Sequence, residues 1–221
     1  MDWTAVPVHM IDFEGCTRSG IVEYGVVTLH RGEIAAIEGR LCASTGPIWS
    51  EDTRVHGLRD EELSGLEPFS CEWERFACLR ETGVLAAHFA ATERRLLRAV
   101  WPYPRTSPDF LNTGERRTDW GPWIDTGRLV IGLRPDLARA GLEEVIHALG
   151  LFAELEARGR ELCPKGRAHF HCALFDALAA ALVLRTLGVD GSGQALSLQK
   201  MVEESTADGE KREVLRQGRL F

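Results

Sequence analysis

The first forty residues alternate apolar and polar side chains and are rich in valine and isoleucine, which is the period-two pattern of β-strands. The pattern predicts three strands, at residues 6–13, 21–29 and 34–42. His30, Arg31 and Gly32 are predicted to form the tight turn between the second and the third strand.

Beyond residue 42 the pattern changes to helices that alternate with short strands. Four segments are polar or irregular and are interpreted mainly as loops or tails, and six segments have a helical period or a short apolar run. We predict mainly loop at 44–64 with one short helical turn, a helix at 68–80, a buried parallel strand at 84–87, a helix at 92–100, an irregular exposed excursion at 101–120, a short strand at 123–126, an amphipathic helix at 142–149 closed by Gly150, a charged loop at 158–167, a long helix at 172–187 ended by Gly188, and a helical extension or tail at 189–221. This order indicates an α/β domain at residues 1–188 with a mixed β-sheet flanked by helices.

Two acidic residues lie inside the first apolar run. Asp12 and Glu14 are two residues apart, so on a strand both point to one face. Two carboxylates on one face of a buried strand repel each other unless a cation lies between them. The first strand therefore predicts part of a divalent-metal site.

Composition and charge restrict the function classes. The chain has 221 residues, 44% of them hydrophobic and 27% charged, which is ordinary for a globular protein. The formal net charge of −7 argues against tight, non-specific binding to nucleic acid, although it leaves room for a nuclease that contacts its substrate through metal ions and a few arginines. The alanine- and leucine-rich segment 173–187 is too short for a membrane helix, so no membrane association is expected.

The cysteines and the amino-terminal residues bear on location. The chain has six cysteines without a C-x-x-C pair, which favours free thiols over a zinc site or a disulfide framework. Met1, Asp2 and Trp3 lack the basic-then-apolar pattern of a signal peptide. A cytoplasmic location is therefore expected.

The order of motifs resembles the DEDDh branch of the DnaQ-like 3′–5′ exonucleases, which have the ribonuclease-H-like fold. The matching segments are the pair Asp12 and Glu14, the strand Ile21-Val22-Glu23-Tyr24-Gly25-Val26-Val27, Val55-His56-Gly57-Leu58, Ala87-His88-Phe89 with Glu93, Ile124-Asp125-Thr126, and His171-Cys172-Ala173-Leu174-Phe175-Asp176-Ala177. The similarity extends from about residue 6 to residue 187, and the agreement of four motifs in order makes chance similarity improbable.

The resemblance implies a metal-dependent 3′–5′ exonuclease that hydrolyses single-stranded DNA or RNA ends to nucleoside monophosphates. Two Mg²⁺ or Mn²⁺ ions would be held by Asp12, Glu14 and Asp176, with Asp12 between the ions and Glu93 binding one of them directly or through water. His171 would be the general base, because an imidazole titrates near neutral pH.

Candidate substrate contacts follow from the same resemblance. They are Gly15, Cys16 and Thr17 after the first motif, His56, His88, and Arg167 in the basic segment that also contains Arg158, Arg160 and Lys165. Other interpretations stay open: His56 as loop architecture, His88 and Asp125 as residues that orient the site or cap helices, and the basic segment as a solvated turn. The aromatic side chains between residues 101 and 123 either stack on a base or anchor the loop.

The chain departs from the family pattern at two positions of the second motif. Glu93 replaces an aspartate and Phe89 replaces an asparagine; Gly15-Cys16-Thr17 also differs from the family's usual segment. Glu93 alone also fits an exposed helix charge beside Arg94 and Arg95. Two alternative functions therefore remain: a catalytically weakened domain that binds nucleic acid or protein, and a proofreading subunit that works with a polymerase. The sequence leaves open whether the protein forms a homodimer.

Overall fold

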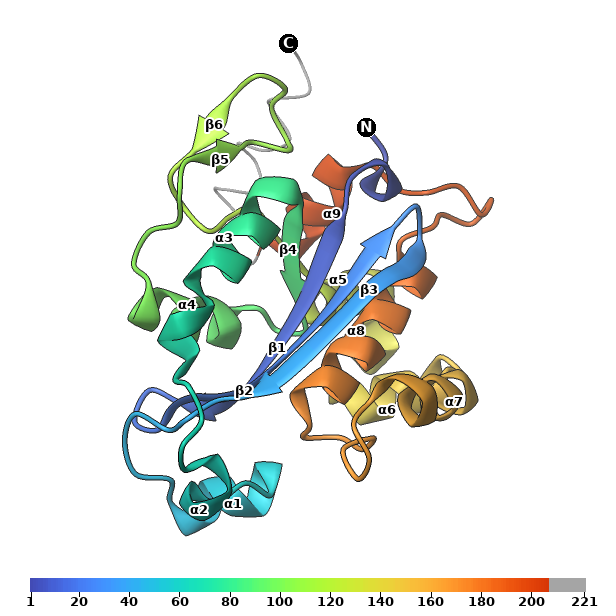
Figure 1. Ribbon diagram of the computed structural model, residues 1–221. Coiled ribbons are helices and arrows are strands. Elements are labelled where there is room, and N and C mark those ends of the chain that lie inside the picture. Colours follow the sequence, from blue (N-terminus) through green and yellow to red (C-terminus); the bar gives the residue numbers. More distant parts are fainter. Residues whose placement is uncertain (207–221) are drawn as a thin grey trace.

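The computed structural model describes residues 1–206, which form a mixed sheet covered by helices on both faces (Figure 1). The sheet consists of β1 (Val8–Cys16), β2 (Gly20–His30), β3 (Glu33–Leu41), β4 (Val84–Ala87) and β7 (Trp123–Asp125) in the order β3-β2-β1-β4-β7. β1, β2 and β3 are antiparallel neighbours, whereas β4 and β7 run parallel to β1. The predicted α/β fold with a mixed sheet is confirmed.

Helices fill the connections between the strands. They are α1 (Ser50–His56), α2 (Asp60–Leu63), α3 (Trp73–Thr82), α4 (Ala91–Val100), α5 (Thr126–Leu133), α6 (Leu142–Ala148), α7 (Phe152–Leu162), α8 (Ala173–Leu187) and α9 (Leu198–Ser205). Short 3₁₀ turns lie at Trp3–Ala5, Phe69–Glu72 and Pro135–Leu137, and a small ribbon pairs β5 (Ser107–Pro108) with β6 (Arg116–Arg117). In the part of the chain described here, no helix is long and apolar enough to cross a bilayer.

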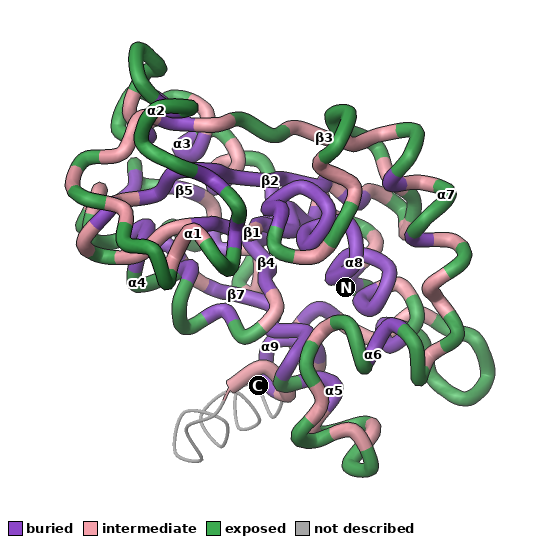
Figure 2. The backbone as a smooth tube through the Cα atoms, turned by 90° about the horizontal axis from the view of Figure 1, so that it is seen from below, coloured by how far each residue is buried: buried purple, intermediate pink, exposed green. Residues whose placement is uncertain are grey.

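Alternation along β1 divides the core into two layers. Met10 packs with α8, α5, α6 and α9 on one face, and Ile11 packs with α3 and α4 on the other. Nearly every residue of α8 is buried, and Figure 2 shows this helix and the central strands in the colour of buried residues. α8 contacts both β1 and β2, so its first turn lies over the strand that carries Asp12 and Glu14.

Three segments differ from the sequence-based predictions. Residues 152–162 form α7, so the predicted charged loop at 158–167 is wrong for its first half; Leu155 and Gly159 of that helix are buried, and Arg158 pairs with Glu154 one turn earlier. The predicted loop at 44–64 contains α1 and α2. The sequence analysis predicted no helix directly after residue 126, where the structure has α5. Asp125 is the N-cap of α5 and accepts a hydrogen bond from the backbone N–H of Arg128.

The predicted C-terminal extension is partly within the described residues. Its helix α9 contacts α5 and β7, and Leu198, Met201 and Val202 are buried in the same core layer as α8. Residues 207–221 of the predicted extension lie outside the described residues.

The excursion at 101–120 is anchored to the core by aromatic rings and a buried arginine. The Trp101 and Trp120 rings pack against Trp73, and the Trp120 indole donates to the Trp101 carbonyl at 2.8 Å. Arg80 is fully buried and donates to the carbonyls of Pro108 and Asp119. Of the two interpretations of these aromatic residues, the structure therefore agrees with anchoring for Trp101 and Trp120.

Gly25 allows α8 to approach β2 closely. A Cβ atom at Gly25 would lie 2.4 Å from the carbonyl carbon and oxygen of Ala173 and from the Cα atom of Leu174. These are backbone atoms at the start of α8, so they cannot move aside as the end of a flexible side chain can. The absence of a side chain at Gly25 therefore determines how near Asp176 comes to β1.

We expect Gly25→Ala to lower the free energy of unfolding by at least about 2 kcal/mol, because the added methyl group overpacks a backbone contact. In a protein of this size that loss lowers the melting temperature by roughly 4–8 °C. Gly39→Ala is the matched control, since Gly39 faces Gly25 across β2 and β3. Its Cβ would lie 3.2 Å from the Leu174 Cβ and the Tyr24 carbonyl oxygen, a milder approach than the 2.4 Å at Gly25. Equal melting temperatures for the two variants would contradict this account of the close approach.

Candidate metal centre

Acidic side chains from three elements meet where β1 passes under the start of α8. Asp12 and Glu14 share the face of β1 that packs on α8, and Asp176 lies in the first turn of that helix. The carboxylates of Glu14 and Asp176 and the imidazole of His171 each offer an atom within 4.8 Å of the other two. The structure thus brings together the first and last predicted motifs.

Glu93 joins this group from the opposite side. It lies in the first turn of α4 and is only 6% exposed, and its charge acts on Asp12. The alternative interpretation of Glu93 as an exposed helix charge is therefore wrong. α4 and α8 lie on opposite sides of β1 (Figure 1), and the charges of Glu93, Glu14 and Asp176 all act on Asp12.

Burial and mutual repulsion disfavour the ionised form of these groups. Burial, with the neighbouring charges of Asp176, Glu93 and Glu14, raises the pKa of Asp12 well above its usual value. Burial and the charge of Asp176 raise the pKa of Glu14 to about 8. Burial is also the main cause that raises the pKa of Glu93 and of Asp176 to about 7.

These residues fit a divalent cation. The Oδ1 atom of Asp176 and the Oε2 atom of Glu93 are buried and have no hydrogen-bond partner among the described residues. Buried polar atoms are normally paired, and oxygen ligands of this kind suit Mg²⁺ or Mn²⁺. A cation among the four carboxylates would satisfy these atoms and remove the repulsion.

Metal-free protein is therefore expected to lose stability as the pH rises from about 5 to about 8. Carboxyl groups whose folded pKa is about 7 to 8, against about 4 when unfolded, stay protonated only in the folded state across this range. The unfolded state then binds fewer protons, so stability present at low pH is lost as the pH rises through the folded pKa values.

Thermal unfolding in EDTA at several pH values measures this loss, and adding Mg²⁺ or Mn²⁺ at about pH 8 is expected to restore several degrees of melting temperature. Glu14→Gln removes one of the repelling charges, so this variant should show a flatter pH dependence and a smaller response to metal. A wild-type melting temperature that is unchanged by both pH and metal would exclude a cation site at these carboxylates.

Glu23 is a residue of this site to which the sequence analysis gave no role. It is buried on β2 directly opposite Glu14, and it accepts a hydrogen bond from the backbone N–H of Ala173 at 3.2 Å. Its charge also raises the pKa of Asp176 and of Glu14. The sequence could have indicated Glu23, because antiparallel pairing of the first two predicted strands places a residue of the second strand opposite Glu14.

Arg167 neutralises Glu23. Its guanidinium pairs with both carboxylate oxygens of Glu23 and donates to the backbone carbonyl of His56 at 3.2 Å. The sequence analysis expected Arg167 to contact substrate phosphates, and that role stays a prediction; in the structure its guanidinium pairs with Glu23. Arg167 lowers the pKa of Glu14 and so partly offsets the charge of Glu23 at the carboxylate centre. It also joins the end of α1 to β2.

His171 has an unusual backbone conformation for its position. Its φ is 63°, in the left-handed region, and its backbone N–H donates to Asp176 Oδ2 at 2.9 Å. The imidazole is exposed. Left-handed conformation is uncommon outside glycine and costs energy, and histidine, asparagine and aspartate adopt it more often than other residues. Asp176 thereby holds His171 at the carboxylate centre.

The other two predicted histidines are internal. Nδ1 of His56 accepts from the backbone N–H of Leu58 at 3.1 Å, and the residue is almost fully buried. Nδ1 of His88 shares a hydrogen bond of 2.9 Å with the Thr126 hydroxyl, and burial lowers the pKa of His88 to about 4. These contacts agree with the interpretation of both residues as parts of the architecture.

Asp125 organises the segment that leads into α4. Its carboxylate accepts from the backbone N–H groups of Phe89 and Ala90 and from that of Arg128, so it joins the start of α4 to the start of α5. Phe89 has a φ of 55° and is 39% exposed, and its ring lies against Gly127. Asp125 was expected to orient the site or cap a helix, and the structure confirms the helix cap.

The segment after Glu14 forms the tip of the β1–β2 hairpin. Gly15 has a φ of 118°, and a Cβ there would lie 2.2 Å from the Gly20 carbonyl oxygen. The backbone N–H of Cys16 donates to the Ser19 hydroxyl at 3.1 Å, and Thr17 is exposed. These three predicted substrate contacts are thus adjacent to the carboxylate centre, beyond Glu14, and their role stays a prediction.

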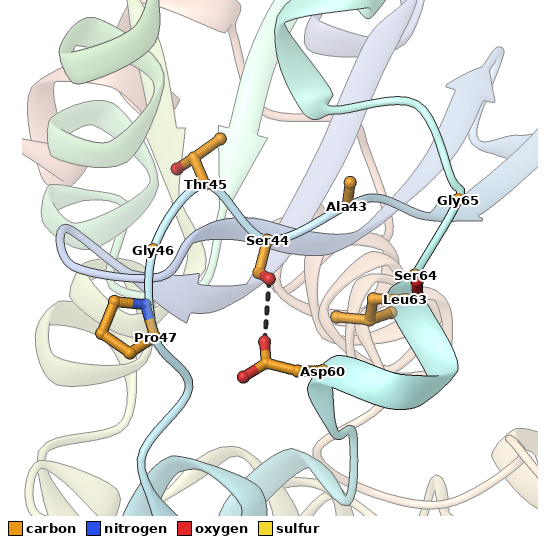
Figure 3. Close-up of a pocket in the computed structure, with 9 residues that line it drawn as sticks. All are labelled: Ala43, Ser44, Thr45, Gly46, Pro47, Asp60, Leu63, Ser64 and Gly65. Carbon is orange, nitrogen blue, oxygen red and sulfur yellow. Dashed lines mark hydrogen bonds between the residues drawn. The ribbon is translucent and has the colours of Figure 1, made fainter.

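A surface hollow lies apart from this centre, between the segment after β3 and α2 (Figure 3). Its polar groups include the Ser44 hydroxyl, which donates to Asp60 at 2.8 Å. None of the carboxylates of the candidate centre lines this hollow. The hollow is therefore separate from the candidate metal centre.

No family model matches the chain, and no curated protein matches it. Solved structures do. Exonuclease X in complex with 5′ overhanging duplex DNA has 20% identity and a TM-score of 0.61, covering 90% of this chain and 99% of that one. The nuclease domain of 3′hExo, a DEDDh family member bound to rAMP, has 16% identity and a TM-score of 0.58, covering 85% and 94%.

Exonuclease I of E. coli in complex with a dT13 oligonucleotide has 11% identity and a TM-score of 0.58, covering 82% of this chain and 41% of that one. At these identities the likeness concerns the fold. The chain has the fold of the DEDDh 3′-exonucleases, as the order of its motifs predicted.

Proposed function

We propose that this protein is a metal-dependent 3′–5′ exonuclease that removes nucleoside monophosphates from single-stranded DNA or RNA. The observation that carries the proposal is the convergence of Glu14, Asp176 and His171 within ligand distance, with Asp12 and Glu93 acting on the same centre, in a fold shared with 3′-exonucleases.

The chain's own residues have separate tasks in this proposal. Asp12, Glu14, Glu93 and Asp176 would hold two Mg²⁺ or Mn²⁺ ions, which would supply positive charge to neutralise the phosphate and stabilise the attacking and leaving oxygens. His171, exposed beside Glu14 and Asp176, takes the proton from the attacking water. Arg167 supports the site through Glu23.

The test uses 5′-labelled single-stranded DNA and RNA oligomers with Mg²⁺, Mn²⁺ or EDTA. A ladder that shortens from the 3′ end, requires metal and yields nucleoside monophosphates is the expected result, and the relative rates on DNA and RNA rank the two substrates. Cleavage that persists in EDTA, or products that begin at the 5′ end, would contradict the proposal.

A catalytically weakened binding domain is the second candidate, because Glu93 stands where the family has aspartate. Glu93 is buried with a free Oε2 atom, and its charge already acts on Asp12. The glutamate side chain is therefore long enough for its charge to act on Asp12 from α4. We infer that the site is built around glutamate.

Glu93→Asp is therefore expected to lower kcat by about 10²-fold, because shortening the side chain withdraws the carboxylate by roughly 1 Å from its position. Single-turnover rates on the same oligomer measure the effect, with Glu156→Asp on the exposed side of α7 as control. A large gain in rate for Glu93→Asp would instead favour the weakened domain.

A further inference from the structure

The helix that carries Glu93 exposes three arginines on its solvent side, beginning at the residue next to Glu93. Glu93, Leu96 and Leu97 of α4 are buried, whereas Arg94, Arg95 and Arg98 are exposed. We call these three arginines the α4 arginine face. Within residues 1–206, their side chains make no ion pair and no hydrogen bond, in contrast to Arg75, Arg105 and Arg117, which pair with carboxylates.

This arrangement is unfavourable for the isolated helix. Arg94 and Arg98 are four residues apart, so their like charges face each other on one side of α4 and destabilise it by a few tenths of a kcal/mol. Arg94 and Arg95 also lie in the first half of the helix, near the end where the macrodipole is positive. An anion bound to this face would relieve both costs.

The negative net charge of the protein means that a nucleic acid strand can bind only where the surface is locally positive. With a net charge of −7 and several carboxylates at the candidate centre, the protein as a whole repels a polyanion. Binding of a nucleic acid strand near the centre therefore requires a local positive surface. The charge of Arg167, in the predicted basic segment, is already paired with Glu23, so it adds little net positive charge to such a surface.

The position of the α4 arginine face suits the strand that leads to the centre. Glu93 and Arg94 are consecutive residues, so the face begins within one helical turn of the carboxylates. α4 and α8 lie on opposite sides of β1 (Figure 1). Phe89, an exposed aromatic residue, precedes the same helix by two residues.

We propose that the α4 arginine face binds the phosphodiester backbone of the single strand on the 5′ side of the nucleotide being removed. The inference rests on the proposed function for the identity of that strand. It goes beyond it by assigning a second contact surface, separate from the metal centre, that recognises charge and not base sequence.

The test compares two double variants of equal charge. Arg94→Gln/Arg98→Gln removes two charges from the face, and glutamine keeps helix propensity close to that of arginine. Arg31→Gln/Arg139→Gln removes two exposed arginines elsewhere; Arg31 lies in the β2–β3 turn, at the end of the hairpin away from Glu14. Melting temperatures confirm that all proteins are folded.

Binding is measured first, by fluorescence anisotropy of a labelled dT20 oligomer in EDTA, which requires no catalysis. We expect the α4 double variant to bind roughly tenfold more weakly, with a slope of log affinity against log salt lowered by about 1.4, or about 0.7 for each phosphate contact with a single strand. The control double variant should bind as the wild type does. Equal binding by all three proteins, or no binding by the wild type, overturns the inference.

Cleavage then separates the two proposals. KM on the 20-mer should rise by a similar factor in the α4 double variant, while kcat/KM on the p-nitrophenyl ester of thymidine 5′-monophosphate, which has no 5′-ward phosphate backbone, stays at the wild-type value. If the wild type binds the oligomer through α4 but cleaves neither substrate, the exonuclease proposal fails and the α4 surface stands. If the wild type cleaves and the α4 variant cleaves and binds equally well, the α4 surface fails alone.

Discussion

Asp176→Asn is expected to lower the rate of 3′-end cleavage by about 10³-fold while making the metal-free protein more stable. The rate falls because an amide carries no charge to hold a cation or offset its field at the phosphate, and single electrostatic contacts at such sites contribute about 10²–10³-fold. Stability rises because one member of a repelling carboxylate group is removed, and burial already raises the pKa of Asp176 to about 7.

Asparagine is the right replacement because it keeps the local structure. Its side-chain oxygen can still accept the hydrogen bond that the backbone N–H of His171 donates to Asp176. Single-turnover cleavage and thermal unfolding in EDTA near pH 8 measure the two effects. Asp136→Asn, at an exposed residue paired with Arg134, is the control. Loss of both activity and stability would mean that Asp176 acts through folding and not through charge.

Short-range periods in the sequence predicted the strands and the Asp12–Glu14 pair, whereas the resemblance to the DEDDh exonucleases supplied Asp176, His171 and Glu93. Alternation on the first strand places Asp12 and Glu14 on one face, and the helix that follows His171 places Asp176 in its first turn. Each of these needs only a few neighbouring residues. A buried strand at 84–87 was predictable for the same reason, since a continuous apolar run stood directly before a helical pattern.

The pairing of Glu23 with Arg167 could not be predicted from local sequence patterns, because the two residues are 144 positions apart. Nothing in a local window distinguishes an arginine that neutralises a buried carboxylate from one that binds phosphate. α7 was missed for another reason: charged residues dominate 158–167, although Phe152, Leu155 and Leu162 carry a helical period. Tertiary packing of Leu155 and Gly159 on the core outweighed that local polarity.

His171→Ala is expected to lower the cleavage rate by about 10²–10⁴-fold, the range that proton transfer by a positioned side chain contributes. It should also destabilise the protein by about 1–2 kcal/mol, since alanine is strained at the φ of 63° that His171 adopts. A single alanine variant therefore confuses two effects, loss of the imidazole and displacement of the backbone N–H that Asp176 holds.

His171→Asn and His171→Gly separate them, because both residues accept a left-handed backbone and neither is a base. If the imidazole takes the proton from water, all three variants lose activity to a similar extent, and His171→Ala loses the most stability. If His171 mattered only for the backbone, asparagine and glycine would keep most of the activity that alanine loses. Single-turnover cleavage rates and melting temperatures of the three variants distinguish these cases. The general-base role predicts that the cleavage rate depends on the presence of the imidazole, whereas the melting temperature depends on whether residue 171 tolerates a positive φ.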